Sequence, residues 1–341
     1  MAIADTGYLS TVREQLVQRR GRLQEVLGKG ETAQLNHLLE EVDEALQRIN
    51  VGSFGVCEHC RGTIEDERLL TDPLVRVCLE CLTPAQQRAL EYDLQLAAQL
   101  QNGLLPPTNL AIEGWNISYH FQPAGVVSGD YCDLISDGRG GLYFVIADVA
   151  GKGLAAAMLS ANLRTLFHAL IPLNFTPEAL LAHANRLFRE STLPAYYATV
   201  VFGKSTASGE LAIVNAGHLP ALLVRQSGIT VFESNNLPLG LFSEQEFCAS
   251  RVLLAPGDTV VVYTDGISEA RNEAGEEYGA NSLNSLVQEQ RHSCPSELVS
   301  AFRRHLGRFR GARTRHDDET LLAVQYDPVS QASLEQNVAT A

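Results

Sequence analysis

Near the middle of the chain the sequence reads Gly141-Leu-Tyr-Phe-Val-Ile-Ala-Asp148-Val-Ala-Gly-Lys-Gly-Leu154. The apolar run before Asp148 predicts a buried strand, the glycines after it predict a tight turn, and the alanine-rich residues 154–167 predict a helix. Asp148 is therefore expected where a buried strand reaches the surface, a suitable position for a metal ligand. The turn is not a phosphate-binding P-loop, because Ile146 and Gly153 stand where that motif needs a glycine and a serine or threonine.

The chain has 341 residues, of which 45% are hydrophobic, and a formal net charge of −14. This length is sufficient for two domains. The acidic balance argues against a general nucleic-acid or anionic-membrane binder, because nothing offsets phosphate repulsion. The first residues lack the pattern of a signal peptide, and no segment is expected to supply the roughly 20 apolar residues of a membrane helix. Seven cysteines, four of them in two close pairs, predict a reducing compartment with a metal site, so the protein is expected in the cytoplasm.

Two helices are predicted near the start of the chain, over residues 8–27 and 35–49. Their apolar side chains recur at heptad spacing: Leu9, Val12, Leu16, Leu23 and Val26 in the first helix, and Leu35, Leu38, Val42, Ala45 and Ile49 in the second. The Gly28-Lys29-Gly30 break between them predicts a helical hairpin over residues 1–50. The hairpin either packs on a neighbouring part of the chain or forms a coiled coil with a partner, and the sequence leaves both open.

A connecting helix is predicted over residues 84–105, within a segment 84–107. Pro84 is typical of a helix entry, and Pro106-Pro107 predicts its end. An apolar stripe runs along it, formed by Leu90, Leu94, Ala97 and Leu104. This stripe is one surface through which a homodimer could form.

Between the hairpin and this helix, four cysteines follow the pattern C-x2-C-x17-C-x2-C: Cys57, Cys60, Cys78 and Cys81. Two such pairs bring four thiolates together as a closed, tetrahedral structural zinc site. A redox pair and a chance pattern are the alternatives. His59 is interpreted as an exposed bystander. A zinc ion would stabilise a segment of some 30 residues that is too small for a core of its own.

This segment resembles the zinc finger of the DksA/TraR family, placed at residues 51–83. The resemblance is carried by Asn50-Val-Gly-Ser-Phe-Gly-Val-Cys-Glu-His-Cys60, Glu67-Arg-Leu-Leu70 and Val77-Cys-Leu-Glu-Cys81, and it covers about residues 38–83. It implies contact with RNA polymerase, which members of that family make with acidic residues at the tip of a helical hairpin. The tip here, Gly28-Lys29-Gly30-Glu31-Thr32, does not match, so a dimerisation or sensing module is the alternative.

From about residue 115 onward, short runs rich in Val, Ile, Tyr and Phe predict strands. They are Ile117–Gln122, Leu142–Asp148, Tyr197–Gly203, Leu211–Asn215, Ala221–Arg225, Ile229–Glu233, Thr259–Thr264 and Thr320–Tyr326. Ser-Gly turns at 208–209 and 227–228 indicate antiparallel hairpins. Helices are predicted over 154–170, 177–192, 280–291 and 295–308. Hairpins mixed with helices predict an α+β layered domain, and the polar residues 329–341 are expected to form a flexible tail.

Four acidic motifs lie at predicted strand edges in this domain. They are Ser128-Gly-Asp130-Tyr-Cys-Asp133, Ala147-Asp148-Val-Ala-Gly151, Tyr263-Thr-Asp265-Gly-Ile-Ser-Glu269 and Arg315-His-Asp317-Asp318-Glu-Thr320. Carboxylates without nitrogen or sulfur ligands suit hard cations such as Mg2+ or Mn2+. A single Asp-Gly is more often a simple turn, but four such motifs together favour a metal site.

These motifs also resemble the SpoIIE/RsbU branch of the PPM-type, metal-dependent protein phosphatases. The resemblance spans about residues 93–327 and includes, besides the acidic motifs, Asn215-Ala-Gly-His-Leu-Pro-Ala-Leu222 and Pro238-Leu-Gly-Leu241 in the family's order. It implies an αββα sandwich of two antiparallel sheets over residues 108–328, with metals in a cleft at one end.

The resemblance also implies roles for single residues. Asp148 would bridge two Mn2+ or Mg2+ ions with help from the Val149 carbonyl, and Asp265 and Asp317 would complete the ligands of one metal. Asp130 would hold a metal directly or through water. The weaker candidates are Asp133, expected to orient a ligand, and Asp318, expected to cap a strand edge or contact water.

Lys152 stands where the family usually has a histidine. It would act as a proton donor only with a lowered pKa, and otherwise as a charge that attracts phosphate, or as a solvated side chain without a role. His218 is interpreted as a structural turn residue near the cleft.

The function implied is a phosphoserine/phosphothreonine protein phosphatase that uses a metal-activated water and is regulated by the zinc-bearing segment. Its implied substrate is a phosphorylated regulatory protein of the anti-sigma-factor antagonist type. The alternative is a transcription-associated adaptor, in which the zinc finger is the working part and the phosphatase fold is catalytically degenerate.

Overall fold

The computed structural model describes residues 6–28, 33–107, 112–193 and 196–328, and the chain divides into two compact units, Met1–Asp93 and Leu94–Ala341. The domain limits expected from the sequence stay a prediction. The predicted tail at 329–341 and most of the predicted hairpin tip lie outside the described residues.

In the first unit, two helices pack on each other as the heptad pattern predicts: α1 (Thr6–Leu27) and α2 (Ala33–Asn50). Four apolar side chains form the buried centre of the pair, and they are Val12, Leu16, Val42 and Ala45. Leu23 and Ile49 are partly buried beside them, whereas the side chain of Val26 lies outside the described residues.

Three of the four paired cysteines belong to a small separate core in this unit, and Cys60 is exposed. Cys57 and Cys78 are buried with Ile64 and Leu69, the latter on the short helix α3 (Asp66–Thr71). A 3-10 turn, η1 (Leu79–Cys81), carries the last cysteine, and α4 (Pro84–Leu104) follows it.

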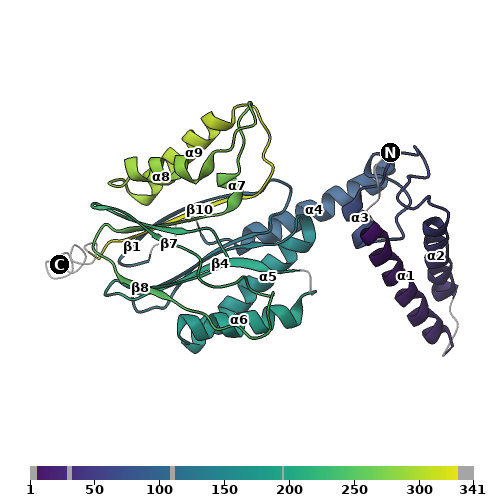
Figure 1. Cartoon of the computed structure of the whole chain (residues 1–341), viewed down its shortest axis with the longest axis horizontal. Helices are drawn as coiled ribbons and strands as arrows, with labels where there is room; N and C mark the ends of the chain where they lie inside the picture. Colours follow the sequence, from purple (N-terminus) through teal and green to yellow (C-terminus); the bar gives the residue numbers. More distant parts are fainter. Residues whose placement is uncertain (1–5, 29–32, 108–111, 194–195, 329–341) are drawn as a thin grey trace, which may run out of the picture. The chain divides into compact units, whose positions relative to one another are not determined.

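The second unit is a four-layer sandwich of two five-stranded antiparallel sheets with helices on both outer faces (Figure 1). One sheet has the order β1-β10-β9-β6-β7, and the other has β2-β3-β4-β5-β8. The strands are β1 (Trp115–Gln122), β2 (Asp130–Ser136), β3 (Leu142–Val149), β4 (Ala198–Ser205), β5 (Glu210–Ala216), β6 (Ala221–Arg225), β7 (Gly228–Phe232), β8 (Ser250–Leu253), β9 (Thr259–Tyr263) and β10 (Glu319–Tyr326). The predicted αββα architecture is confirmed.

Three apolar cores hold the layers together, one between the sheets and one under each helix pair. The helices on the β3 side are α5 (Gly153–Leu170), which η2 (Ile171–Leu173) follows, and α6 (Pro177–Ser191). Those on the β10 side are α7 (Asp265–Ser268), α8 (Gly279–Glu289) and α9 (Pro295–Arg310). Because alternate residues of a strand face opposite ways, β3, in which every residue except Asp148 is buried, contributes to two cores at once.

Sequence reasoning missed two strands, β2 and β8, and the short helices α3 and α7. It also expected no segment with the length and apolar character of a membrane span. Within the described residues, Gly153–Leu173 meets those criteria, with a mean hydropathy of 1.4. The face of α5 formed by Ala156, Leu163 and Phe167 is packed in the core against β3, as in core helices of soluble folds.

Candidate metal centre and zinc site

Two of the predicted aspartates face each other across neighbouring strands. Asp130 is the first residue of β2, Asp148 is near the end of β3, and the antiparallel register pairs them directly. The alternation of the strands places Asp130 on the same face as Cys132, and Asp148 on the same face as Ile146, which belong to the core between the sheets. Both carboxylates therefore lie at one end of the sandwich.

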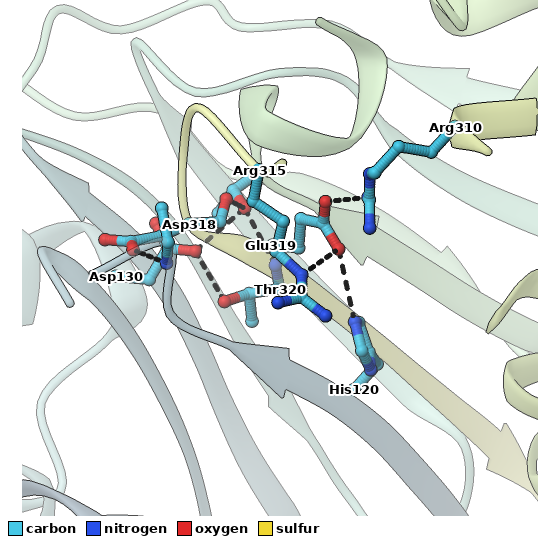
Figure 2. A network of polar contacts seen from close by, with 9 residues as sticks. His120, Asp130, Arg310, Arg315, Asp318, Glu319 and Thr320 are labelled. Carbon is cyan, nitrogen blue, oxygen red and sulfur yellow. Dashed lines mark hydrogen bonds and ion pairs between the residues drawn. The ribbon is translucent and has the colours of Figure 1, made fainter. Parts of the chain in front are cut away.

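Asp130 is almost completely buried and accepts hydrogen bonds from the opposite sheet. Its Oδ2 atom lies 2.9 Å from Thr264 Oγ1. The same atom lies 2.5 Å from Thr320 Oγ1 (Figure 2). Burial, reinforced by the nearby Asp148 carboxylate, raises the pKa of Asp130 well above its usual value. The two hydroxyls satisfy one oxygen of a carboxylate that would otherwise be costly to bury.

Asp265 reaches the same end of the sandwich from the other sheet, as the first residue of α7, two residues after the end of β9. A Cβ atom added to Gly266 would lie 2.0 Å from the carbonyl oxygen of Asp318. Only glycine permits this approach, which brings the start of α7 against the segment that precedes β10.

The acidic side chains from both sheets influence one another. Burial, followed by the charges of Asp265, Asp317 and Asp318, raises the pKa of Asp148 to about 7. Burial and the charge of Asp317 likewise raise the pKa of Asp265. Such mutual repulsion is what a bound cation relieves.

Asp317, which precedes β10, is engaged by Lys152 at the start of α5. Lys152 Nζ donates to Asp317 Oδ2 at 2.8 Å and to the His316 carbonyl at 2.9 Å. The hydrogen bond to Asp317 raises the pKa of Lys152. A proton-donor role required a lowered pKa, so the geometry favours Lys152 as a permanent positive charge.

The side chain of Asp318 binds the loop between β1 and β2, and so it is not directed only at the other aspartates. Its two carboxylate oxygens accept hydrogen bonds from the backbone N–H groups of Ala124 at 2.7 Å and Gly129 at 2.8 Å. This resembles the strand-edge capping that the sequence predicted for Asp318. The contact fixes residues 124–129, which lead into Asp130.

Asp133 does not take the ligand-orienting role expected for it. It points to the opposite face of β2, where its Oδ2 lies 2.7 Å from His168 Nε2 and 2.9 Å from the Tyr131 hydroxyl. Because Asp130 and Asp133 are three residues apart in a strand, their side chains must face opposite ways. Asp133 attaches β2 to α5 instead.

His218 is buried and both of its ring nitrogens are engaged. Nε2 donates to the Tyr263 carbonyl at 3.1 Å, so Nδ1 accepts from the Thr199 hydroxyl at 2.7 Å. Burial lowers the pKa of His218 to about 4. A neutral histidine with both nitrogens occupied fits the structural role predicted for it.

The donor set at this end of the sandwich fits hard divalent cations. Asp130, Asp148, Asp265 and Asp317 offer oxygen atoms alone, and the Val149 carbonyl lies close to Gly129, 3.2 Å from where a Cβ on that residue would be. Oxygen ligands and accumulated negative charge are what Mg2+ and Mn2+ prefer. In the described part of the chain these aspartates do not form a group with all ligand atoms within 4.8 Å, as the cysteines do.

Sequence reasoning overlooked the two threonines that bond Asp130. Each belongs to one of the aspartate motifs: Thr264 directly follows β9, and Thr320 is the second residue of β10. Their position was visible in the sequence, but the contact joins residues 134 and 190 positions apart.

The four cysteines of the first unit come together within the described residues, with all sulfur atoms within 4.8 Å of one another. Cys60 Sγ lies 3.6 Å from Cys78 Sγ, close to the roughly 3.8 Å edge of a tetrahedron with Zn–S bonds of about 2.3 Å. Backbone N–H groups of Cys60 and then Cys78 lower the pKa of Cys57 to about 6, which favours the thiolate that zinc binds. These residues fit a structural zinc ion.

Comparison with known proteins agrees with both parts of the chain. The family described as "Stage II sporulation protein E (SpoIIE)" matches residues 138–327, and the "Prokaryotic dksA/traR C4-type zinc finger" matches residues 52–87. The first match covers more than half of the chain, so the chain belongs to the SpoIIE family of PPM-type phosphatases. Both resemblances drawn from the sequence are confirmed.

Among particular relatives, the chain is 26% identical over 242 residues to the phosphoserine phosphatase RsbU of Bacillus subtilis, covering 70% of this chain and 71% of RsbU. It is 26% identical over 261 residues to protein IcfG of Synechocystis, covering 68% of this chain but only 41% of IcfG. The chain thus spans less than half the length of IcfG. The solved SiaA-PP2C domain of Pseudomonas aeruginosa shares the fold, with a TM-score of 0.63 and 22% identity over 71% of this chain and 98% of that domain.

Proposed function

We propose that this chain is a metal-dependent phosphatase that hydrolyses phosphoserine or phosphothreonine on a regulatory protein. The observation that carries the proposal is the gathering of Asp130, Asp148, Asp265 and Asp317 at one end of the two sheets. Family membership and the name of its relative RsbU, a phosphoserine phosphatase, support the same reaction.

The proposed ligands are Asp148 as the bridge, with the Val149 carbonyl, Asp265 and Asp317, and Asp130 directly or through water. Two Mg2+ or Mn2+ ions held there would lower the pKa of a water molecule and neutralise the phosphoryl oxygens. The protein's own contribution is rigid placement. The hydroxyls of Thr264 and Thr320 fix the Asp130 carboxylate, and the contact between Gly266 and Asp318 fixes the approach of Asp265. Lys152, kept charged, would attract a phosphate dianion to the rim of the site.

Hydrolysis of p-nitrophenyl phosphate with Mn2+ tests the reaction. We expect activity in the full chain, its loss by at least about 100-fold in Asp148→Ala, and its survival in Cys57→Ser, because replacing even an outer partner of a metal ligand commonly costs 10- to 100-fold. Glu244→Gln, at an exposed position, is the control. Absence of turnover with every divalent ion would favour the adaptor alternative.

The proposed substrate is a phosphorylated anti-sigma-factor antagonist, acted on in the cytoplasm, and the zinc-bearing segment is proposed as the regulatory part. Comparison of phosphoproteomes with active enzyme and with Asp148→Ala would identify the substrate. Contact with RNA polymerase is left out of the proposal, because residues 28–32 lack the acidic pattern that such contact uses.

A homodimer through α4 is part of the proposal. No residue of α4 is buried, and of the predicted stripe Leu90 is 39% exposed while Leu94, Ala97 and Leu104 are partly exposed. Light scattering of the full chain should give twice the mass of one chain, and a chain starting near Gly114 should be monomeric. A monomeric full chain would contradict the dimer.

A further inference from the structure

A cavity of about 350 Å³ lies beside the proposed metal ligands, between α7 and the loop 311–318 that joins α9 to β10. Lys152 and Asp317 line it, so it adjoins the rim of the metal centre. Five of its lining residues are lysine or arginine, and three are aspartate or glutamate. This excess of positive charge contrasts with the chain's net charge of −14.

A buried carboxylate holds the cationic wall in place. Glu319, which is 3% exposed, pairs with Arg310 through Oε1 and lies 3.6 Å from Arg315 Nε through Oε2 (Figure 2). His120 Nε2 is 3.7 Å from the same Oε2 atom. Arg310 is itself only 12% exposed, so Glu319 and Arg310 neutralise each other as part of the wall.

Two arginines keep their charge available to a ligand. Arg313 donates through NH1 to the Asn272 carbonyl at 2.9 Å, which is a neutral acceptor, and it forms no ion pair within the described residues. Arg315 is 39% exposed and shares Glu319 with Arg310. Guanidinium groups fixed in this way are well suited to carboxylates, which they bind through two parallel hydrogen bonds.

The cavity is joined to the metal centre through successive residues of one strand. Glu319 faces the arginines, whereas the next residue, Thr320, donates to Asp130 (Figure 2). A side chain held by Arg313 and Arg315 would thus belong to a residue only a few positions from the one whose phosphate is bound at the metals.

We propose that this cavity binds acidic side chains that flank the phosphorylated residue, so that the enzyme selects phosphoproteins with aspartate or glutamate next to the phosphoserine. Arg313 and Arg315 are the specificity-determining residues, and Glu319 and Arg310 position them. This inference rests on the proposed phosphatase function for its substrate, but its charge recognition can be measured without turnover.

The first experiment compares two phosphoserine peptides, one flanked by aspartates and one flanked by asparagines, with the full chain and Mn2+. We expect kcat/KM to be about fivefold higher for the acidic peptide, mainly through KM, since exposed charge pairs contribute modestly. The double variant Arg313→Gln/Arg315→Gln should bring the ratio of the two kcat/KM values close to one, and Arg315→Lys should retain most of it. Arg251→Gln, which removes a charge from β8, is the matched control.

The second experiment measures fluorescence anisotropy of the unphosphorylated acidic peptide, which cannot be turned over. Binding should weaken about fivefold in the double variant and fall with added salt. Equal kcat/KM values for the two peptides, or equal binding by wild type and double variant, would overturn the inference. Arginine-dependent binding without hydrolysis of p-nitrophenyl phosphate would instead overturn the phosphatase function and leave the acidic-ligand site standing.

Discussion

Lys152 Nζ and Asp317 Oδ2 lie 2.8 Å apart, so a cation of the protein is bonded to one of the carboxylates proposed to bind a metal. The lysine side chain is 58% exposed and the aspartate 39% exposed. A metal ion that takes this oxygen as a ligand must displace the ammonium group or share Asp317 with it.

Replacement of Lys152 is therefore expected to strengthen metal binding. In Lys152→Gln, Mn2+ no longer has to break the ion pair of Lys152 with Asp317 in order to bind. The dissociation constant for Mn2+ should therefore fall about two- to fivefold, because an exposed ion pair is of modest strength. Isothermal titration calorimetry measures this directly, with Lys204→Gln, at a partly buried lysine of β4 that bonds Asn174, as the control. Weaker Mn2+ binding in Lys152→Gln would contradict the competition.

The raised pKa of Asp148 predicts a pH-dependent stability of the metal-free protein. Between about pH 4 and 7 the folded state holds a proton on Asp148 that the unfolded state has released, so stability conferred by Asp148 is lost as pH rises through this window. Asp148→Asn lacks this penalty. At pH 8 without metal it should be more stable than the wild type, by up to about 4 kcal/mol, and the difference should shrink toward pH 4.

Chemical denaturation of the phosphatase unit at several pH values measures this difference. His218, whose lowered pKa makes stability rise between about pH 4 and 6.5, contributes to both proteins and cancels in the comparison. A constant difference from pH 4 to pH 8 would show that Asp148 is not the titrating group.

The close approach at Gly266 predicts a strong effect of one methyl group. In Gly266→Ala the Cβ atom would meet the Asp318 carbonyl at 2.0 Å, so α7 and Asp265 must move. We expect p-nitrophenyl phosphate turnover to fall more than about tenfold, because small displacements of reacting groups can cost 100-fold. Gly307→Ala, in α9 with no atom within 4 Å of its added Cβ, should keep full turnover and unfold at a higher temperature. Equal activity in Gly266→Ala and Gly307→Ala would refute the packing argument.

The cysteine cluster predicts one tightly bound zinc ion per chain. Cys57→Ser removes a buried ligand, so residues 51–83 should lose their structure and become sensitive to protease, because the small core of Ile64 and Leu69 cannot hold them alone. Metal analysis and limited proteolysis measure both effects. Cys248→Ser, at an exposed free cysteine, should keep the zinc. A zinc content unchanged in Cys57→Ser would argue against the site.

Much of the sandwich was predictable because its strands are buried on both faces or alternate regularly. Residues 142–147 and 260–263 are continuous apolar runs, and the Ser-Gly turns do form antiparallel hairpins. The strand Asp130–Ser136 was missed because its aspartates favour interpretation as a loop motif. The short edge strand Ser250–Leu253 carries too few residues for a pattern.

The candidate site was predictable in its residue types but not in its orientations. The aspartates could be located because each lies in or next to the end of a strand. That Asp133 faces away from Asp130 follows from strand periodicity, yet only once the segment is known to be a strand. The hydroxyls on Asp130 depend on contacts between distant segments, which periodicity in a single sequence does not contain. The arginine pairs of Glu319 are local, but the loop between α9 and β10 has no regular period from which to predict them.

The loop between α9 and β10 has no regular hydrogen-bonding pattern before Glu319, and its side chains at Arg313 and Arg315 are not part of any apolar core. Substitution of these side chains would change the stability of the fold little. Thr320 of the neighbouring strand would still donate its hydrogen bond to Asp130. Enzymes that descend from one ancestor could thus come to act on different substrate proteins through substitutions at a few loop positions, while the reaction stays the same.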